Sequence, residues 1–169
     1  MLAILLAVCF LPAQAPTPGK ADPWASLHFL MGAWQTKITG GVAQGPSADH
    51  YNFRLELHDH VLARHARVGP CTNPDDYECA HTDLLYIYPT ADGKGFQAIY
   101  FDNSGHVIRY DVTTPKVNSA VFLSDAAQPG PQYRLSYQLD EGTLSGKLEI
   151  KLPNQTDFTS LVEWSGKKE

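Results

Sequence analysis

Basic residues are scarce in this sequence. It has 13 Lys and Arg against 18 Asp and Glu, which gives a formal net charge of -5. No extended run of Lys or Arg is present, although nucleic acids and anionic membranes are bound through clusters of these residues. We therefore expect neither a nucleic-acid partner nor a membrane partner.

Motifs that identify a reaction are also lacking. The sequence has no G-x-S-x-G elbow, no H-E-x-x-H, no phosphate-binding glycine loop and no dinucleotide fingerprint. No pair of carboxylates is spaced as the general acid and general base of a catalytic site would be. These absences favour a protein that is not an enzyme, but they leave the question open.

A hydrophobic run long enough to span a membrane, about 20 residues, is absent too. The apolar run from Met1 to Leu11 is shorter, and Ala13-Gln14-Ala15 follows it as a small-x-small cleavage site. This pattern is typical of a secretory signal peptide over residues 1–15. We expect export to the periplasm or extracellular space, a linker over 16–21 and a single domain over 22–169. A buried N-terminal strand or helix is the alternative.

Only three cysteines are present, and Cys9 lies in the expected signal peptide. In an exported chain, the remaining Cys71 and Cys79 are expected to form a disulfide across a surface loop. Closing so short a loop would stabilise the fold by about 2 to 3 kcal/mol in the chain-entropy model. A metal or catalytic role for the pair is the alternative, although no C-x-x-C spacing supports it.

Helical signals are confined to one place. Asp22 is a good helix cap, Pro23 suits the first helical position, and Trp24, Leu27 and Leu30 follow at helical spacing. From Trp34 onward the sequence reads as strands and turns. The ten expected strands are Trp34 to Thr39, His50 to Leu57, His60 to Val68, Asp83 to Tyr88, Phe96 to Asp102, His106 to Thr113, Asn118 to Ser124, Gln132 to Leu139, Thr143 to Leu152 and Asp157 to Ser165.

Hairpin-length turns rich in Gly, Asn, Asp and Pro separate nearly all of these strands, which predicts antiparallel neighbours. Ten short strands in an open sheet would leave long exposed edges, and closure into a barrel removes them. We therefore predict an all-β fold, an up-and-down antiparallel barrel of about ten strands with a short N-terminal helix at one end. A barrel of this size has room for a cavity. A two-sheet sandwich is the alternative.

The stretch Phe29-Leu30-Met31-Gly32-Ala33-Trp34 runs from a helix end through Gly-x-Trp into the first strand. In this respect the chain resembles the calycin superfamily, in particular nitrobindin-like and lipocalin-like barrels, and is most similar to exported bacterial lipocalin-like domains of unassigned function. Nitrobindins imply a haem held by a histidine on the last strand. Asp157 to Ser165 contains no histidine, so the resemblance does not carry the iron ligand to this chain, and we expect no cofactor, with haem as the alternative.

Candidate ligand-binding residues come from strand alternation. After the turn Asp102-Asn103-Ser104-Gly105, His106 and Tyr110 share a face, whereas Arg109 belongs to the other face and is expected at the surface. On the strand before that turn, Tyr100 is assigned to the interior. Arg64 falls on the more apolar face of its strand, where its buried charge needs a partner. That partner is a structural acid, a tyrosine hydroxyl or a ligand carboxylate.

Tyrosines complete the expected site, because each supplies an apolar ring with a donor at its end. The full set of expected ligand-binding residues is Arg64, Tyr86, Tyr100, His106, Tyr110, Tyr133 and Tyr137. His58 and His60 form a possible metal pair, but Asp59 sits at a hairpin turn that separates them, so no metal site is expected. The predicted function is binding of a small hydrophobic or amphipathic molecule inside the barrel. A haem-dependent or other small-molecule enzyme, with His106 as base, and an interaction module with a filled barrel are the alternatives.

Overall fold

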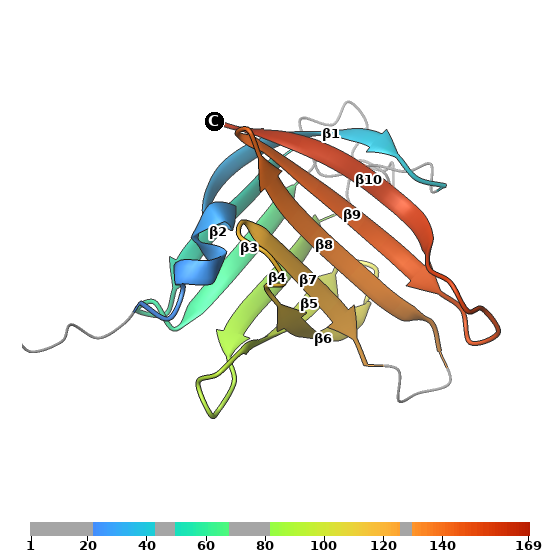
Figure 1. Cartoon of the computed structure of the whole chain (residues 1–169), viewed down its shortest axis with the longest axis horizontal. Helices are drawn as coiled ribbons and strands as arrows, with labels where there is room; N and C mark the ends of the chain where they lie inside the picture. The colour runs from blue at the N-terminus through green and yellow to red at the C-terminus, as the bar shows by residue number, and fades with distance from the viewer. Residues whose placement is uncertain (1–21, 43–49, 68–81, 126–129) are drawn as a thin grey trace, which may run out of the picture.

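A computed structural model describes residues 22–42, 50–67, 82–125 and 130–169. The described residues form one short 3-10 helix and ten antiparallel strands (Figure 1). The elements are η1 (Ala25–Leu30), β1 (Gly32–Gly40), β2 (His50–Glu56), β3 (Val61–Arg67), β4 (Thr82–Pro89), β5 (Phe96–Asp102), β6 (Val107–Thr113), β7 (Ser119–Ser124), β8 (Gln132–Asp140), β9 (Thr143–Lys151) and β10 (Thr159–Lys168). The expected signal peptide, linker and Cys71–Cys79 disulfide lie outside the described residues.

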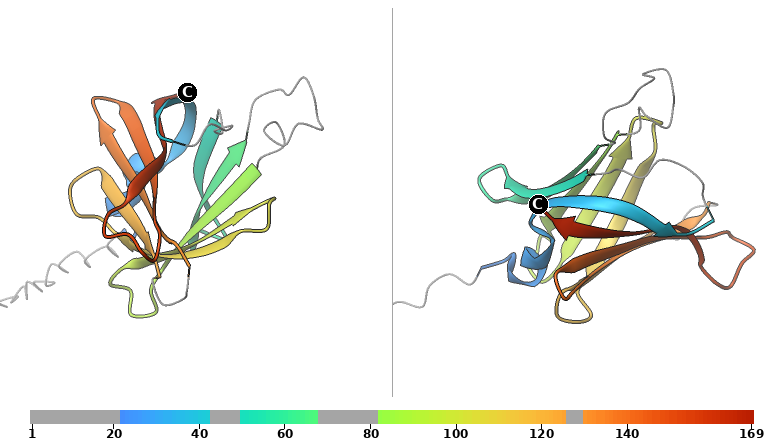
Figure 2. Two further views of the ribbon diagram at one scale, coloured as in Figure 1. Left: turned by 90° about the vertical axis from the view of Figure 1, so that its right-hand side faces the viewer. Right: turned by 90° about the horizontal axis from the view of Figure 1, so that it is seen from above.

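The strands close into a barrel in sequence order, with β1 paired to both β2 and β10 (Figure 2). The predicted up-and-down barrel is therefore confirmed, and the sandwich alternative is not formed. Closure requires the last strand to reach the first. β10 does so over a longer stretch than expected, because it continues past Ser165 to Lys168 and pairs Lys168 with Trp34.

One end of the barrel is plugged by η1 and the residue before it. Asp22 accepts a hydrogen bond from the Trp24 backbone N–H at 2.9 Å, but it does not cap the helix as predicted, because η1 begins at Ala25 and its N-cap is Trp24. Trp24 then stacks on Phe96 with ring centroids 5.1 Å apart, and its indole N–H donates to the carbonyl of Asp59 at 2.8 Å. Phe96 begins β5 and Asp59 lies in the β2–β3 turn, so the plug seals the end where these turns lie.

The half of the barrel next to the plug is filled by side chains. Trp24, Leu27 and Leu30 are buried against inward residues of the strands, among them Phe53 and Phe122. Burying each large apolar side chain contributes about 1.5 to 3 kcal/mol. This part of the barrel is a packed core and carries the fold. The opposite end holds the β5–β6 turn and the β9–β10 connection.

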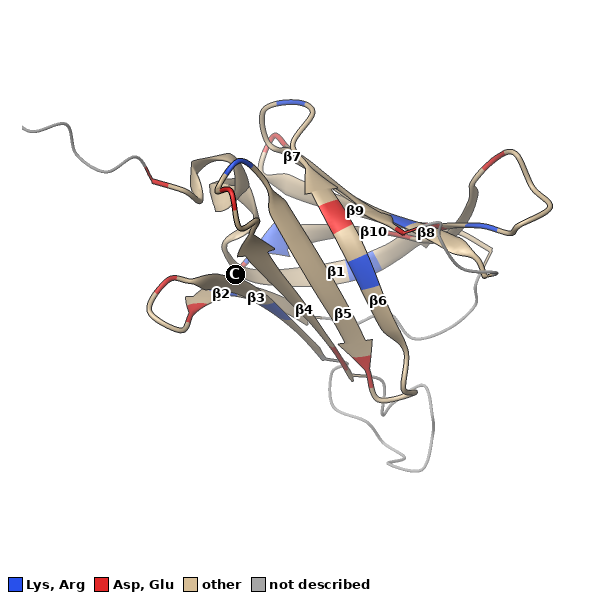
Figure 3. Cartoon of the chain, turned by 90° about the horizontal axis from the view of Figure 1, so that it is seen from below, with Lys and Arg blue, Asp and Glu red and all other residues tan. Residues whose placement is uncertain are grey.

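Charged positions are spread over the strands and turns. Figure 3 shows Lys and Arg interspersed with Asp and Glu, without a concentration of either sign in that view. Within the described residues, no helix has the length and apolar character needed to cross a membrane.

Candidate functional site

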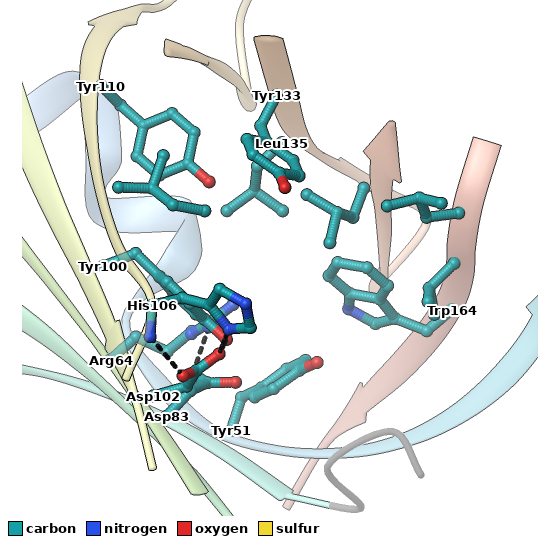
Figure 4. Close-up of a pocket in the computed structure, with 14 residues that line it drawn as sticks. Tyr51, Arg64, Asp83, Tyr100, Asp102, His106, Tyr110, Tyr133, Leu135 and Trp164 are labelled. Atoms are coloured by element: carbon teal, nitrogen blue, oxygen red, sulfur yellow. Dashed lines mark hydrogen bonds and ion pairs between the residues drawn. The ribbon is translucent and has the colours of Figure 1, made fainter. Parts of the chain in front are cut away.

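The end of the barrel away from η1 contains a cavity of about 290 Å³, at the small end of the range for ligand sites, which is about 300 to 1,000 Å³. Residues from eight strands and the β5–β6 turn line it (Figure 4). They are Tyr51, Arg64, Asp83, Tyr100, Asp102, His106, Ile108, Tyr110, Tyr133, Leu135, Leu148, Leu161, Val162 and Trp164.

Strand register brings the central part of this wall together. Arg64 on β3 pairs with Leu85 on β4, Leu85 pairs with Tyr100 on β5, and Tyr100 pairs with Ile108 on β6. Directly paired residues point to the same face of a sheet, so this row faces the interior. Arg64, Tyr100 and Tyr110 are thus placed on the inner face, as the alternation predicted.

Arg64 is the buried cation of the site, with 3% of its surface exposed. It forms an ion pair with Asp83 and donates a hydrogen bond to the Tyr137 hydroxyl. Its guanidinium also lies over the Tyr51 ring, 4.8 Å from the centroid. Burial alone would lower the pKa of Arg64, but Asp83 and the phenol oxygens outweigh it and hold the pKa well above the ordinary value. Of the three kinds of partner predicted for Arg64, the structure shows two, a structural acid and a tyrosine hydroxyl.

His106 lies at the mouth of the cavity, in the turn before β6 begins at Val107, and not on the inner face of that strand as predicted. Its side chain is 63% exposed, and its Nδ1 is 2.8 Å from Oδ2 of Asp102, whose side chain is only 6% exposed. Asp102 also accepts hydrogen bonds from the backbone N–H groups of Ser104 and His106 and from the Tyr100 hydroxyl. Burial would raise the pKa of Asp102, but the bonds from His106 and Ser104 outweigh it and lower the pKa.

Tyrosine hydroxyls form the polar side of the cavity. Figure 4 shows Tyr110 and Tyr133 pointing their hydroxyls toward the space that Trp164 borders from another side. Burial raises the pKa of Tyr51, of Tyr100 and of Tyr110. These phenols therefore stay protonated in neutral solution and can donate hydrogen bonds.

Two expected tyrosines lie elsewhere. Tyr137 points inward and is buried, but it sits beneath the cavity, where it supports Arg64 and packs edge-on against Phe53 at 5.6 Å. The expectation for Tyr86 is wrong. Tyr86 pairs with Ala63 on the outer face of the sheet and lies edge-on to His65, with ring centroids 6.5 Å apart. The inner face of β4 carries Asp83 in place of the expected Tyr86.

The apolar side of the cavity comes from β6 and β8 to β10, and consists of Ile108, Leu135, Leu148, Leu161 and Val162. Trp164 extends this wall, and the Nε1 edge of its ring packs over Gly146 on β9, where a side chain would collide with the indole. Two buried donors at the site, Trp164 Nε1 and Arg64 Nε, have no hydrogen-bond partner among the described residues. Neither atom is reached by solvent, so neither donor faces the open space of the cavity.

The remaining histidines do not build a metal centre. His58 and His60 lie in the β2–β3 turn, where Leu57, His58 and Asp59 have positive φ and are exposed. Across the four described segments, no group of three or more His, Cys, Asp or Glu residues is placed to hold a metal ion. Arg109 lies on the exposed outer face of β6, as expected.

Sequence comparisons add no assignment to this geometry. No known protein-family model matches the chain, and no curated protein sequence matches it either. The structure itself shows a closed ten-stranded antiparallel barrel, a fold that is compatible with the calycin resemblance.

Proposed function

We propose that the protein binds a small amphipathic molecule in the cavity at the end of the barrel opposite η1. The observation that carries this proposal is a half-filled interior. The core is packed next to the plug, whereas the other half holds a cavity with an apolar side and a polar side. A barrel built only as an interaction module would have no need of buried polar groups around unfilled space.

The two sides of the cavity have separate roles in this proposal. Ile108, Leu148 and Val162 would remove the apolar part of the ligand from water, which contributes about 25 cal/mol per Å² of buried apolar surface. The Tyr110 and Tyr133 hydroxyls would orient the polar part. The Arg64–Asp83 ion pair would hold the wall rigid, because both groups are buried and bonded to each other.

Acid–base catalysis is the second candidate, and the Asp102–His106 contact favours it. A carboxylate bonded to Nδ1 orients an imidazole so that Nε2 can take a proton. His106 borders the cavity, so its Nε2 would act on a molecule bound there. Exchange of α-protons of 2-octanone in D₂O, measured by proton NMR with the wild type and His106→Gln, tests this candidate. Equal exchange rates for the two proteins would dismiss it.

Haem has no part in this proposal, because the residues of the site do not fit it. The inward positions of β10 are Val162, Trp164 and Gly166, so the last strand offers no axial histidine. The Nδ1 of His106 is already engaged by Asp102, and a porphyrin is larger than a cavity of about 290 Å³.

Titration with N-phenyl-1-naphthylamine, an uncharged dye that fluoresces in apolar surroundings, tests the proposed function. We expect a saturable rise in fluorescence at one dye per chain, reversed by addition of octanamide as a competing amphipathic molecule. A fluorescence rise that octanamide does not reverse, or no saturable rise at all, would contradict binding in the cavity. Export and the Cys71–Cys79 disulfide are proposed with it, since both follow from the N-terminal pattern.

A further inference from the structure

We infer that the cavity selects an uncharged ligand that carries an acceptor oxygen, such as an amide, ketone or alcohol, and discriminates against carboxylates. This inference rests on the proposed function and names the chemical class of its ligand. It departs from the first expectation that a buried arginine in a barrel offers, which is a salt bridge to the carboxylate of a fatty acid or similar molecule.

The charge of Arg64 is already balanced inside the protein. Asp83 forms an ion pair with the guanidinium, and both side chains are more than nine-tenths buried. The Tyr137 hydroxyl takes a second N–H and the Tyr51 ring covers the guanidinium face. A ligand carboxylate would have to displace Asp83 from this cluster, which would leave a buried carboxylate without its cation, a costly change.

Asp102 is the second acid at the site, and it gives the cavity wall a net negative charge that disfavours an anionic ligand. The charged or titratable side chains among the described residues of the cavity wall are Arg64, Asp83, Asp102 and His106, besides its tyrosines. With the imidazole neutral, their formal charges sum to one negative charge. Asp83 and Asp102 are also directly paired across β4 and β5. An anionic ligand would therefore bring a third carboxylate to a wall that already holds two, and like charges repel strongly in a partly desolvated site.

The donors at the site match an uncharged acceptor. The Tyr110 and Tyr133 hydroxyls point toward the open space of the cavity (Figure 4). The indole N–H of Trp164 is not reached by solvent and packs over Gly146, so it does not take part. An amide, ketone or hydroxyl oxygen can accept from the tyrosine hydroxyls without bringing a net charge.

A pair of nearly isosteric probes, octanamide and octanoate, tests the inference by isothermal titration calorimetry at pH 8.5, where free imidazole is neutral. We expect octanamide to bind at least tenfold more tightly than octanoate. In ¹H–¹⁵N NMR spectra, octanamide should shift the Trp164 indole resonance, because that ring lines the cavity. The indole resonances of Trp24 and Trp34, which do not line it and are hydrogen-bonded to backbone carbonyls, should move little.

Asp102→Asn gives the matched variant, because it removes one negative charge from the wall while the amide oxygen can still accept from the turn. Asp111→Asn is its control, since Asp111 is exposed on the outer face of β6 and bonds Gln97. We expect Asp102→Asn to improve octanoate binding at least threefold and Asp111→Asn to leave it unchanged.

The outcomes separate the two proposals. Octanoate binding as tightly as octanamide, or an unchanged octanoate affinity in Asp102→Asn, would overturn the charge selection while leaving ligand binding intact. Failure of both probes to bind would overturn the proposed function itself. The comparison of the two probes on the wild type needs no variant to fold.

Discussion

His106 Nδ1 lies 2.8 Å from the carboxylate of Asp102, four residues earlier in the chain, across the turn that joins β5 to β6. The imidazole is exposed and the carboxylate is buried, so the pair extends from the solvent to the wall of the cavity. Asp102 also accepts two backbone N–H bonds from the turn. One carboxylate therefore both closes the hairpin and sets the charge at the mouth of the site.

The lowered pKa of Asp102 predicts a contribution to stability that depends on pH. A carboxyl whose folded-state pKa lies below its unfolded value, about 3.9 for Asp, stabilises the fold above that unfolded value. The contribution is lost as the pH falls through the folded-state pKa. We expect Asp102→Asn to lower the free energy of unfolding by about 1.5 to 3 kcal/mol at pH 7, the range for a hydrogen bond to a charged group.

Urea denaturation of the wild type and of Asp102→Asn, from pH 7 down to pH 2.5, checks this prediction. The difference between the two proteins should shrink as the solution becomes acidic. Asp111→Asn, with its side chain on the exposed outer face, should show no such trend. A difference that stays constant over this range would show that the Asp102 carboxylate does not carry the effect.

Removal of the buried cation should be the most damaging single change at the site. Arg64→Met would leave the buried Asp83 carboxylate without its guanidinium, and breaking a buried pair in this way costs about 3 to 5 kcal/mol. The double variant Arg64→Met with Asp83→Leu should recover much of the loss, because it removes both charges. Urea unfolding measures both proteins. Arg109→Met on the outer face is the control and should unfold like the wild type.

Gly146 should tolerate no side chain, because an added Cβ would lie 2.1 Å from Cε2 of Trp164. We expect Gly146→Ala to lower the free energy of unfolding by about 1 to 3 kcal/mol, the range for overpacking a core. Gly95→Ala is the control, since its nearest atom would be 3.9 Å away. Adding Trp164→Phe to Gly146→Ala should relieve the collision, and a double variant less stable than either single one would contradict this packing.

The cysteine pair gives a prediction independent of the cavity. If the chain is exported and oxidised, Cys71 and Cys79 should react with iodoacetamide only after reduction and unfolding. Intact mass spectrometry of protein recovered from the exported fraction should also show a chain that begins at Pro16. Labelling of either cysteine in the unfolded but unreduced protein would contradict the disulfide.

The sequence was a good guide to the strands and a partial guide to their faces. On β6, polar Arg109 and Asp111 alternate with Ile108 and Tyr110, so the inner face was predictable. On β4, both faces carry large apolar residues, so alternation does not decide between them, and Tyr86 was placed in the interior wrongly. The true inner face begins with an acid, Asp83, whose burial is stabilised by Arg64.

Neither acid was predicted as a site residue, because the contacts of both depend on how the strands come together in the fold. Asp83 is next to Arg64 only because β3 and β4 pair in a particular register, which no local pattern specifies. Asp102 did have a local signal, since an Asp opening an Asp-Asn-Ser-Gly turn tends to bond the backbone that follows it. That signal indicated the turn, but the bond to His106 required the folded hairpin.

Calorimetric titration of octanamide into the wild type, Ile108→Phe and Val107→Phe tests the central claim, that the cavity binds a ligand, most directly. These neighbouring residues of β6 face opposite ways, with Ile108 on the cavity wall and Val107 exposed. Filling the cavity with Phe at 108 should weaken binding at least fivefold, whereas Phe at 107 should leave it unchanged. Equal affinity in all three proteins, or no binding to the wild type, would contradict a ligand site inside the barrel.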